Sequence, residues 1–192
     1  MSRESILKAI KKNKPPLLPL PEIDESVFEQ QVNLREVFIQ NIQRVGGKIA
    51  EVTGNEIDNE VLKRYPEAKE IVSITNKSKL GNVIITSETD PHDLKNIDLA
   101  IIEGVFGVAE NGAIWITEKQ SILRALPFIT SHLIILLKKD QLHLHMLQAY
   151  QEIATRNRSF GLFISGPSKT ADIEQSLVIG AHGAMSLSVF LI

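Results

Sequence analysis

The chain has 192 residues, 43% of them hydrophobic, which predicts one domain with a full core and a small N-terminal appendage. A formal net charge of −2 gives no electrostatic reason to expect nucleic acid or an anionic membrane as a partner. The absence of cysteine excludes disulfides, thiolate catalysis and an iron–sulfur cluster held by these residues.

The N-terminal residues have the pattern of a short amphipathic helix followed by a linker. Ile6, Leu7 and Ile10 lie on one side of residues 2–13, with lysines opposite, and Ser2 can cap the helix. Four prolines between positions 15 and 21 then predict an extended segment. We therefore divide the chain into a helix and linker (1–23) and an α/β domain (24–192). The arm either docks loosely or packs on a second subunit, which would make a homodimer.

The sequence shows neither a targeting signal nor a membrane-spanning segment. The start, MSRESILKAIKKNKP, lacks the apolar core of a signal peptide. No apolar run approaches the roughly 18 residues that a membrane-spanning helix needs. We therefore expect a cytoplasmic protein without membrane insertion.

The first half of the domain alternates helical and extended patterns. A helical pattern runs from Asp24 to Ile42 and ends at Gly46 and Gly47. Further elements are expected in chain order: a strand at 48–52, a helix at 55–65, strands at 70–74, 82–86, 97–103 and 113–117, and a helical turn at 120–126.

The last 60 residues alternate strand and helix. The expected elements are a buried strand at 132–137, a helix from Asp140 to Ile153, a strand at 160–165, a helix at 170–179 and a strand at 186–192. This order predicts an α/β fold with a parallel sheet and right-handed crossovers. Ligands of such sheets bind at the carboxyl ends of the strands, and we expect the loops between these strands and helices to emerge there.

The turn GPSKT between the strand at 160–165 and the next helix is the first candidate site. A helix beginning at Thr170 would present free backbone N–H groups beside Lys169, which suits an anion. The residues expected to bind it are Gly166, Ser168, Lys169 and Thr170. The alternative is a capped helix, in which Ser168 or Thr170 accepts from the first turn while Asp172 and Glu174 complement the dipole. Capping leaves the lysine unexplained.

Glu110 is the second candidate. It lies in GVFGVAENGAIWI, where glycines at 104, 107 and 112 allow the backbone to approach a ligand or another strand closely. The alternative is a hairpin, because Asn-Gly is a strong two-residue turn signal. Glu103, at the end of a strand, is a weaker second carboxylate.

The histidines and Arg124 complete the candidates. His182 lies in a Gly-Ala-His-Gly loop before the last strand, and Arg124 could reach an anion. His132 begins a buried strand, whereas His143 and His145 are two residues apart and point to different faces of the expected helix. No His/Asp/Glu cluster has the spacing of metal ligands, so we expect no metal and no bound cofactor.

Four segments occur in order that together resemble a known family. They are GVFGVAENGAIWI, Arg124 with Leu126-Pro127 and His132, GPSKTADIE (166–174), and GAHG (180–183) before an apolar strand. This combination resembles the LUD domain of the lactate utilization protein C family. The resemblance spans roughly residues 30–192, with most of its specificity from residue 98 onward.

The resemblance implies both a fold and a role. It implies a three-layer NagB/RpiA/CoA-transferase-like fold, with a mostly parallel sheet and helices on both faces. Family members are typically encoded with two companion proteins, one of which carries iron–sulfur clusters, and the set is implicated in oxidising L-lactate to pyruvate. An iron–sulfur protein and a small carboxylate ligand are the partners so implied.

The same fold group suggests a chemical role for Glu110. In CoA transferases of similar fold, the glutamate of a Ser-Glu-Asn-Gly segment is the nucleophile, and this chain has Ala109-Glu110-Asn111-Gly112. Ala184 and Ser188 depart from the proline and histidine that are common in the family. Three functions stay open: a subunit of a lactate-oxidising system, a CoA-transferase-like or folate-cyclo-ligase-like enzyme using Glu110, and a non-catalytic interaction module.

Overall fold

The computed structural model describes residues 2–19, 21–22, 24–28, 31–156, 160–171 and 177–192. The chain divides into two compact units, Met1–Gln31 and Val32–Ile192. In the first unit, α1 (Arg3–Lys12) confirms the predicted N-terminal helix, and Ser2 Oγ accepts a hydrogen bond from the Ser5 amide at 3.3 Å. A short 3-10 helix, η1 (Glu25–Phe28), belongs to the same unit.

A five-stranded parallel sheet forms the centre of the second unit. Its order is β1 (Lys48–Glu51), β11 (Ser186–Leu191), β6 (His132–Leu137), β3 (Leu99–Glu103) and β2 (Ile71–Ser73). Every neighbouring pair in this sheet is parallel. The middle strands β11, β6 and β3 are mostly apolar, as expected of strands buried on both faces. The predicted α/β fold with a mostly parallel sheet is confirmed.

A second sheet of four strands packs on the first. Its order is β7 (Leu142–His143), β4 (Phe106–Val108), β5 (Ala113–Thr117) and β8 (Gly161–Ile164). Because β8 pairs antiparallel with β5, the strand before GPSKT lies outside the parallel sheet, contrary to the prediction. The helix expected from Asp140 is likewise shorter, since β7 precedes α6 (Met146–Ala154).

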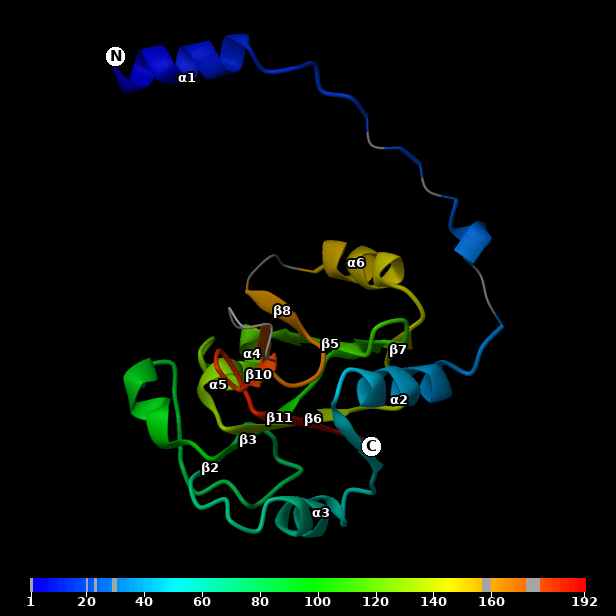
Figure 1. Cartoon of the computed structure of the whole chain (residues 1–192), viewed down its shortest axis with the longest axis vertical. Helices are drawn as coiled ribbons and strands as arrows, with labels where there is room; N and C mark the ends of the chain where they lie inside the picture. Colours follow the sequence, from blue (N-terminus) through cyan, green and yellow to red (C-terminus); the bar gives the residue numbers. More distant parts are fainter. Residues whose placement is uncertain (1, 20, 23, 29–30, 157–159, 172–176) are drawn as a thin grey trace. The chain divides into compact units, whose positions relative to one another are not determined.

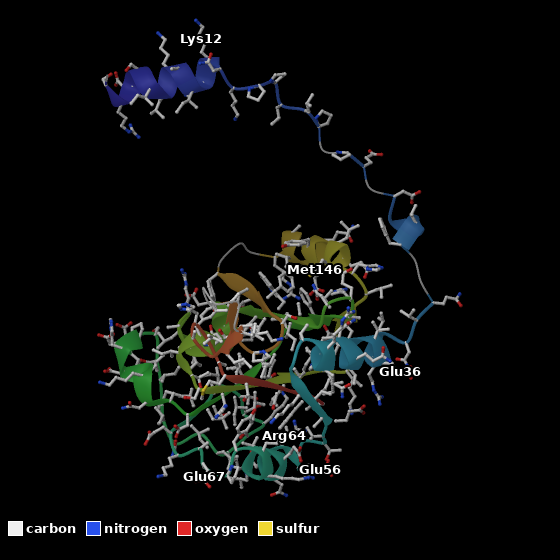
Figure 2. The ribbon with its side chains drawn as sticks, in the orientation of Figure 1. Lys12, Glu36, Glu56, Arg64, Glu67 and Met146 are labelled. Atoms are coloured by element: carbon white, nitrogen blue, oxygen red, sulfur yellow. The ribbon has the colours of Figure 1, made fainter. Side chains whose placement is uncertain are left out.

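Three apolar clusters hold these layers together. One lies between the parallel sheet and α3 (Ile57–Arg64), a second between the two sheets with Phe38 and Ile42 of α2 (Leu34–Arg44), and a third between the four-stranded sheet and α6. Figure 1 shows α3 and α6 on the two outer sides of this stack. In Figure 2, Arg64 extends from α3, and its guanidinium lies 5.3 Å from the centre of the Phe190 ring.

The helix predicted at residues 170–179 is wrong. The structure has β9 (Lys169–Ala171) paired antiparallel with β10 (Leu177–Ile179). Thr170, Val178 and Ile179 are β-branched and favour strands, and Gly180, with a φ of +83°, ends the hairpin in a conformation suited to glycine. Asp172 and Glu174, which were expected to complement a helix dipole, lie outside the described residues.

The remaining segments are short helices and turns. They are η2 (Pro91–Asn96), α4 (Glu118–Ser121) and α5 (Leu126–Ile129). The strand predicted at 82–86 is reduced to one bridge between Val83 and Val72. The helix predicted from Asp24 begins only at Leu34, where Asn33 caps it. None of the helices in the described ranges has the length and apolarity needed to traverse a bilayer.

Candidate functional site

The GPSKT turn and the GAHG loop meet at the amino edge of the parallel sheet. The Ser168 amide donates to the Ala184 carbonyl at 2.9 Å, and the Gly180 amide donates to the Ser168 carbonyl at 3.1 Å. This loop leads into Ser186, the first residue of β11. The prediction that these loops emerge at the carboxyl ends of parallel strands is therefore wrong, because β8 belongs to the other sheet.

Lys169 contacts the C-terminal end of a helix instead of the N-terminal end of one. Its ammonium donates to the Val45 carbonyl, directly after α2. Gly166 has a φ of +75°, and a Cβ there would lie 2.5 Å from the same carbonyl oxygen. A cation near the last carbonyls of a helix stabilises its dipole. Capping of α2 thus explains the lysine that the sequence left unexplained.

Glu110 lies in the turn between β4 and β5, which confirms the hairpin interpretation of this segment. One carboxylate oxygen is 2.8 Å from His145 Nδ1, and the other accepts from the Met146 amide at 2.8 Å. Met146 is the first residue of α6 and is labelled in Figure 2. The Glu110 side chain, 36% exposed, therefore caps the N-terminal turn of α6.

The structure brings only part of the predicted site together. The turn that holds Glu110 does meet the segment before GPSKT, because Ser165 Oγ donates to the Asn111 carbonyl at 2.8 Å. The Glu110 carboxylate, however, is directed to α6, while Ser168 contacts the loop of His182, whose side chain is exposed.

Arg124 forms an exposed cluster of its own. Its Nε donates to Glu118 at 2.8 Å, and its guanidinium lies 5.1 Å from the centre of the Phe160 ring. The Arg124 side chain is 62% exposed, so the ion pair contributes little to stability. Among the described residues, no hydrogen bond or ion pair joins Arg124 to the GPSKT turn, and its anion-binding role stays a prediction.

Glu103 lies at the opposite, carboxyl edge of the parallel sheet. Burial disfavours its charged form, but hydrogen bonds from Lys77 (2.6 Å) and Thr75 (2.5 Å) outweigh that cost and hold the pKa of Glu103 below its usual value. Glu103 is therefore an ionised partner of Lys77 and is not paired with Glu110.

Sequence reasoning missed a polar network at the amino edge. His132 Nδ1 lies 2.8 Å from Ser186 Oγ, and the Tyr65 hydroxyl lies 3.0 Å from Ser186 and 2.8 Å from Ser188. Ser188, within β11, is fully buried. The sequence signal was a histidine and two serines near the starts of apolar strands. Their meeting depends on the register of β6 and β11, which pairs Ser186 with His132.

The pKa of His132 makes a pH dependence of stability expected. Burial lowers this pKa, Asp98 opposes the shift and Lys48 adds to it. The folded state therefore binds the proton less tightly than the unfolded state, whose pKa is about 6.5. The stability due to His132 is present above that value and is lost as the pH falls through the folded pKa.

The measurement is the free energy of unfolding in urea between about pH 7.5 and 5. We expect it to fall more steeply with decreasing pH in the native chain than in His132→Gln, whose amide can still bond Ser186. Equal slopes in the two proteins would contradict the assignment.

Histidine, aspartate and glutamate are common metal ligands in proteins. Within the parts of the chain that the structure describes, no group of three or more His, Asp and Glu side chains is placed to hold a metal ion.

The fold places the protein in a structural class. The arrangement matches the crystal structure of a DUF162 family protein from Deinococcus radiodurans with a TM-score of 0.63 and 16% sequence identity. The match covers 88% of this chain and 99% of that one. At this identity the likeness shows a shared α/β fold.

The family follows from the sequence of the C-terminal half. The LUD domain family model matches residues 88–192, more than half of the chain, and the chain belongs to the LUD domain family. This confirms the resemblance drawn from the motifs, whose most specific part began at residue 98.

Curated relatives carry a common name. The chain is 34% identical over 102 residues to lactate utilization protein C of Bacillus pumilus, covering 48% of this chain and 41% of that protein. It is 28% identical over 134 residues to the protein of the same name from Geobacillus thermodenitrificans, covering 67% and 53%. The matched region spans about half the length of these relatives.

Proposed function

We propose that this chain is a subunit of an L-lactate utilization system that oxidises lactate to pyruvate. The observation that carries the proposal is its similarity to relatives named lactate utilization protein C, concentrated in the LUD domain. The family-model match, residues 88–192, includes Ser168, the loop of His182, and His132 with its partner Ser186. These features support a shared role for this part of the chain.

The proposed system includes an iron–sulfur partner. Converting L-lactate to pyruvate removes two electrons and two protons, so an electron acceptor is required. The 192 residues contain no cysteine and supply no thiolate ligand for a cluster. A second, cysteine-rich polypeptide would hold the redox centre, and this chain would bind it or the small carboxylate substrate.

Growth of the source organism tests the lactate role. A strain lacking this chain is expected to fail on L-lactate as sole carbon source and to grow normally on pyruvate, because only the oxidation step is lost. Reintroducing the intact chain should restore growth on L-lactate. Wild-type growth of the deletion strain on L-lactate would contradict the proposal.

The partner is tested by affinity purification of the tagged chain from cells grown on L-lactate. The expected result is a co-purifying protein that brings iron and acid-labile sulfide in stoichiometric amounts. Purification of the chain without iron under these conditions would contradict the iron–sulfur partner. The lactate role is tested separately by the growth experiment.

A second candidate is a CoA-transferase-like or folate-cyclo-ligase-like enzyme in which Glu110 is the catalytic nucleophile. One observation favours it: the Glu110 carboxylate is 36% exposed and lies beside an imidazole, that of His145. If this candidate is right, Glu110→Gln abolishes activity with little loss of stability, because the glutamine carbonyl can still accept from the Met146 amide. Full CoA-transfer or ligase activity of E110Q would remove Glu110 from the chemistry and leave it as a helix cap.

A further inference from the structure

We propose that the carboxyl edge of the parallel sheet holds a binding site for a small organic anion, centred on Lys138. A cavity of about 460 Å³ opens there. Its lining residues are Gly54, Ile57, Lys77, Lys138, Lys139, Asp140 and Ile192. A cavity of this size is within the range of small-molecule sites, about 300–1,000 Å³.

The position of the cavity follows from the topology of the sheet. β6 ends at Leu137 and runs into Lys138, Lys139 and Asp140, while β11 ends at Leu191 and is followed by Ile192. Lys77 comes from the segment after β2, and Gly54 from the segment after β1. Segments following four of the five parallel strands thus meet at the edge where open α/β sheets bind their ligands.

The charges around the cavity leave one ammonium for a ligand. Lys77 is paired with Glu103 at 2.6 Å, and Lys139 lies 3.8 Å from Glu51. For the Lys138 ammonium, the described side chains provide no hydrogen bond and no ion pair, although its charge helps to lower the pKa of Glu103. Asp140 adds one exposed carboxylate to the lining.

Apolar residues and the start of α3 also line the cavity. Ile57 and Ile192 line the cavity, and Gly54 leaves open space where a side chain would stand. α3 begins at Ile57, and its preceding residue Glu56 makes no side-chain hydrogen bond to the first turn. Instead, Glu56 accepts from Thr53, and because Asp58 and Glu60 also lie in the first turn of α3, these carboxylates offset the positive end of the helix dipole.

These features define the class of ligand. A carboxylate or phosphate group would bond Lys138, and the carbon part of the ligand would contact Ile192, which is partly exposed, whereas Ile57 is fully buried beneath it. The inference does not rest on the proposed function, because any small organic anion with such a group satisfies this chemistry. Binding of L-lactate itself would connect this anion site to the proposed role in lactate utilization.

Titration of the intact chain tests the site. L-Lactate, inorganic phosphate and adenosine 5′-phosphate are added separately at constant ionic strength, with heat of binding and melting temperature as readouts. We expect saturable binding of at least one probe. Lys138→Gln should weaken it about tenfold or more, since a hydrogen bond to a charged group is lost. The matched control is Lys95→Gln, an exposed lysine in η2 at the amino edge of the sheet.

The titrations have results that support the site and results that overturn it. Binding of L-lactate alone identifies a carboxylate site, whereas binding of phosphate or adenosine 5′-phosphate identifies a phosphate site, and either supports the proposal if Lys138→Gln weakens it. The proposal is overturned if no probe binds up to about 10 mM, or if K138Q and K95Q bind equally well. Lys138 is exposed, so both variants are expected to fold.

Discussion

Replacing Phe190 with alanine is expected to lower the free energy of unfolding by about 3–5 kcal/mol. Phe190 lies in β11, between β1 and β6, and is fully buried. Its ring belongs to the apolar cluster between the parallel sheet and α3, and the Arg64 guanidinium lies 5.3 Å from the centre of the ring. Truncation removes this apolar area and leaves a cavity that strands on both sides prevent from collapsing.

Urea unfolding of purified protein measures this loss, with Phe128→Ala as the matched control. Phe128, in α5, is 47% exposed, so its truncation should cost less than about 1 kcal/mol. Because F190A could fall below the stability needed for purification, Phe190→Leu provides a second, milder variant with an intermediate loss. Equal stability of F190A and F128A would show that β11 is not the centre of the core.

Replacing Gly112 with alanine is the second substitution with a large expected effect. Gly112 has a φ of +66°, and a Cβ there would lie 2.9 Å from the Ile42 amide nitrogen and 3.1 Å from the Asn41 carbonyl carbon. The left-handed conformation alone costs alanine about 1–2 kcal/mol, and the clash is with helix backbone rather than a flexible side chain. We expect the free energy of unfolding to fall by at least about 2 kcal/mol in total.

The comparison for this variant is Gly54→Ala, at a position where an added Cβ meets nothing within 4 Å. Its stability should stay within about 0.5 kcal/mol of the native value. Thermal or urea unfolding of both variants measures the difference. If G112A and G54A are equally stable, the turn between β4 and β5 does not pack against α2 as described.

The sequence predicted best those elements whose signal is local and strong. The run His132–Leu137 was predicted with the bounds that β6 has, since six apolar-rich residues in succession leave few alternatives. β11 and β1 were placed within a residue or so for the same reason. The motifs from residue 98 onward also identified the family correctly.

The segment after residue 160 shows where local patterns fail. Strand, glycine turn and a mixed apolar segment predicted a parallel strand followed by a helix. Whether β8 joins the parallel sheet or pairs with β5 depends on contacts about 50 residues apart, such as Ile164 with Ile114. This pairing decides which edge of the sheet receives Ser168 and Lys169, so an error in one strand moved the whole candidate site.

The polar clusters at both edges of the parallel sheet could not be predicted from the sequence for a related reason. Tyr65 and Ser186 are separated by 121 residues, and the lining of the lysine cavity comes from segments between Gly54 and Ile192. No local periodicity encodes such meetings. They arise because parallel strands from distant parts of the chain end side by side.

Extracts of the source organism test most directly whether this chain takes part in oxidising L-lactate, as we propose. Extract from a strain lacking the chain is supplied with L-lactate and a reducible dye, and pyruvate formation is measured. We expect that the oxidation is lost and that adding the purified chain restores it. Wild-type rates of pyruvate formation without the chain would contradict it.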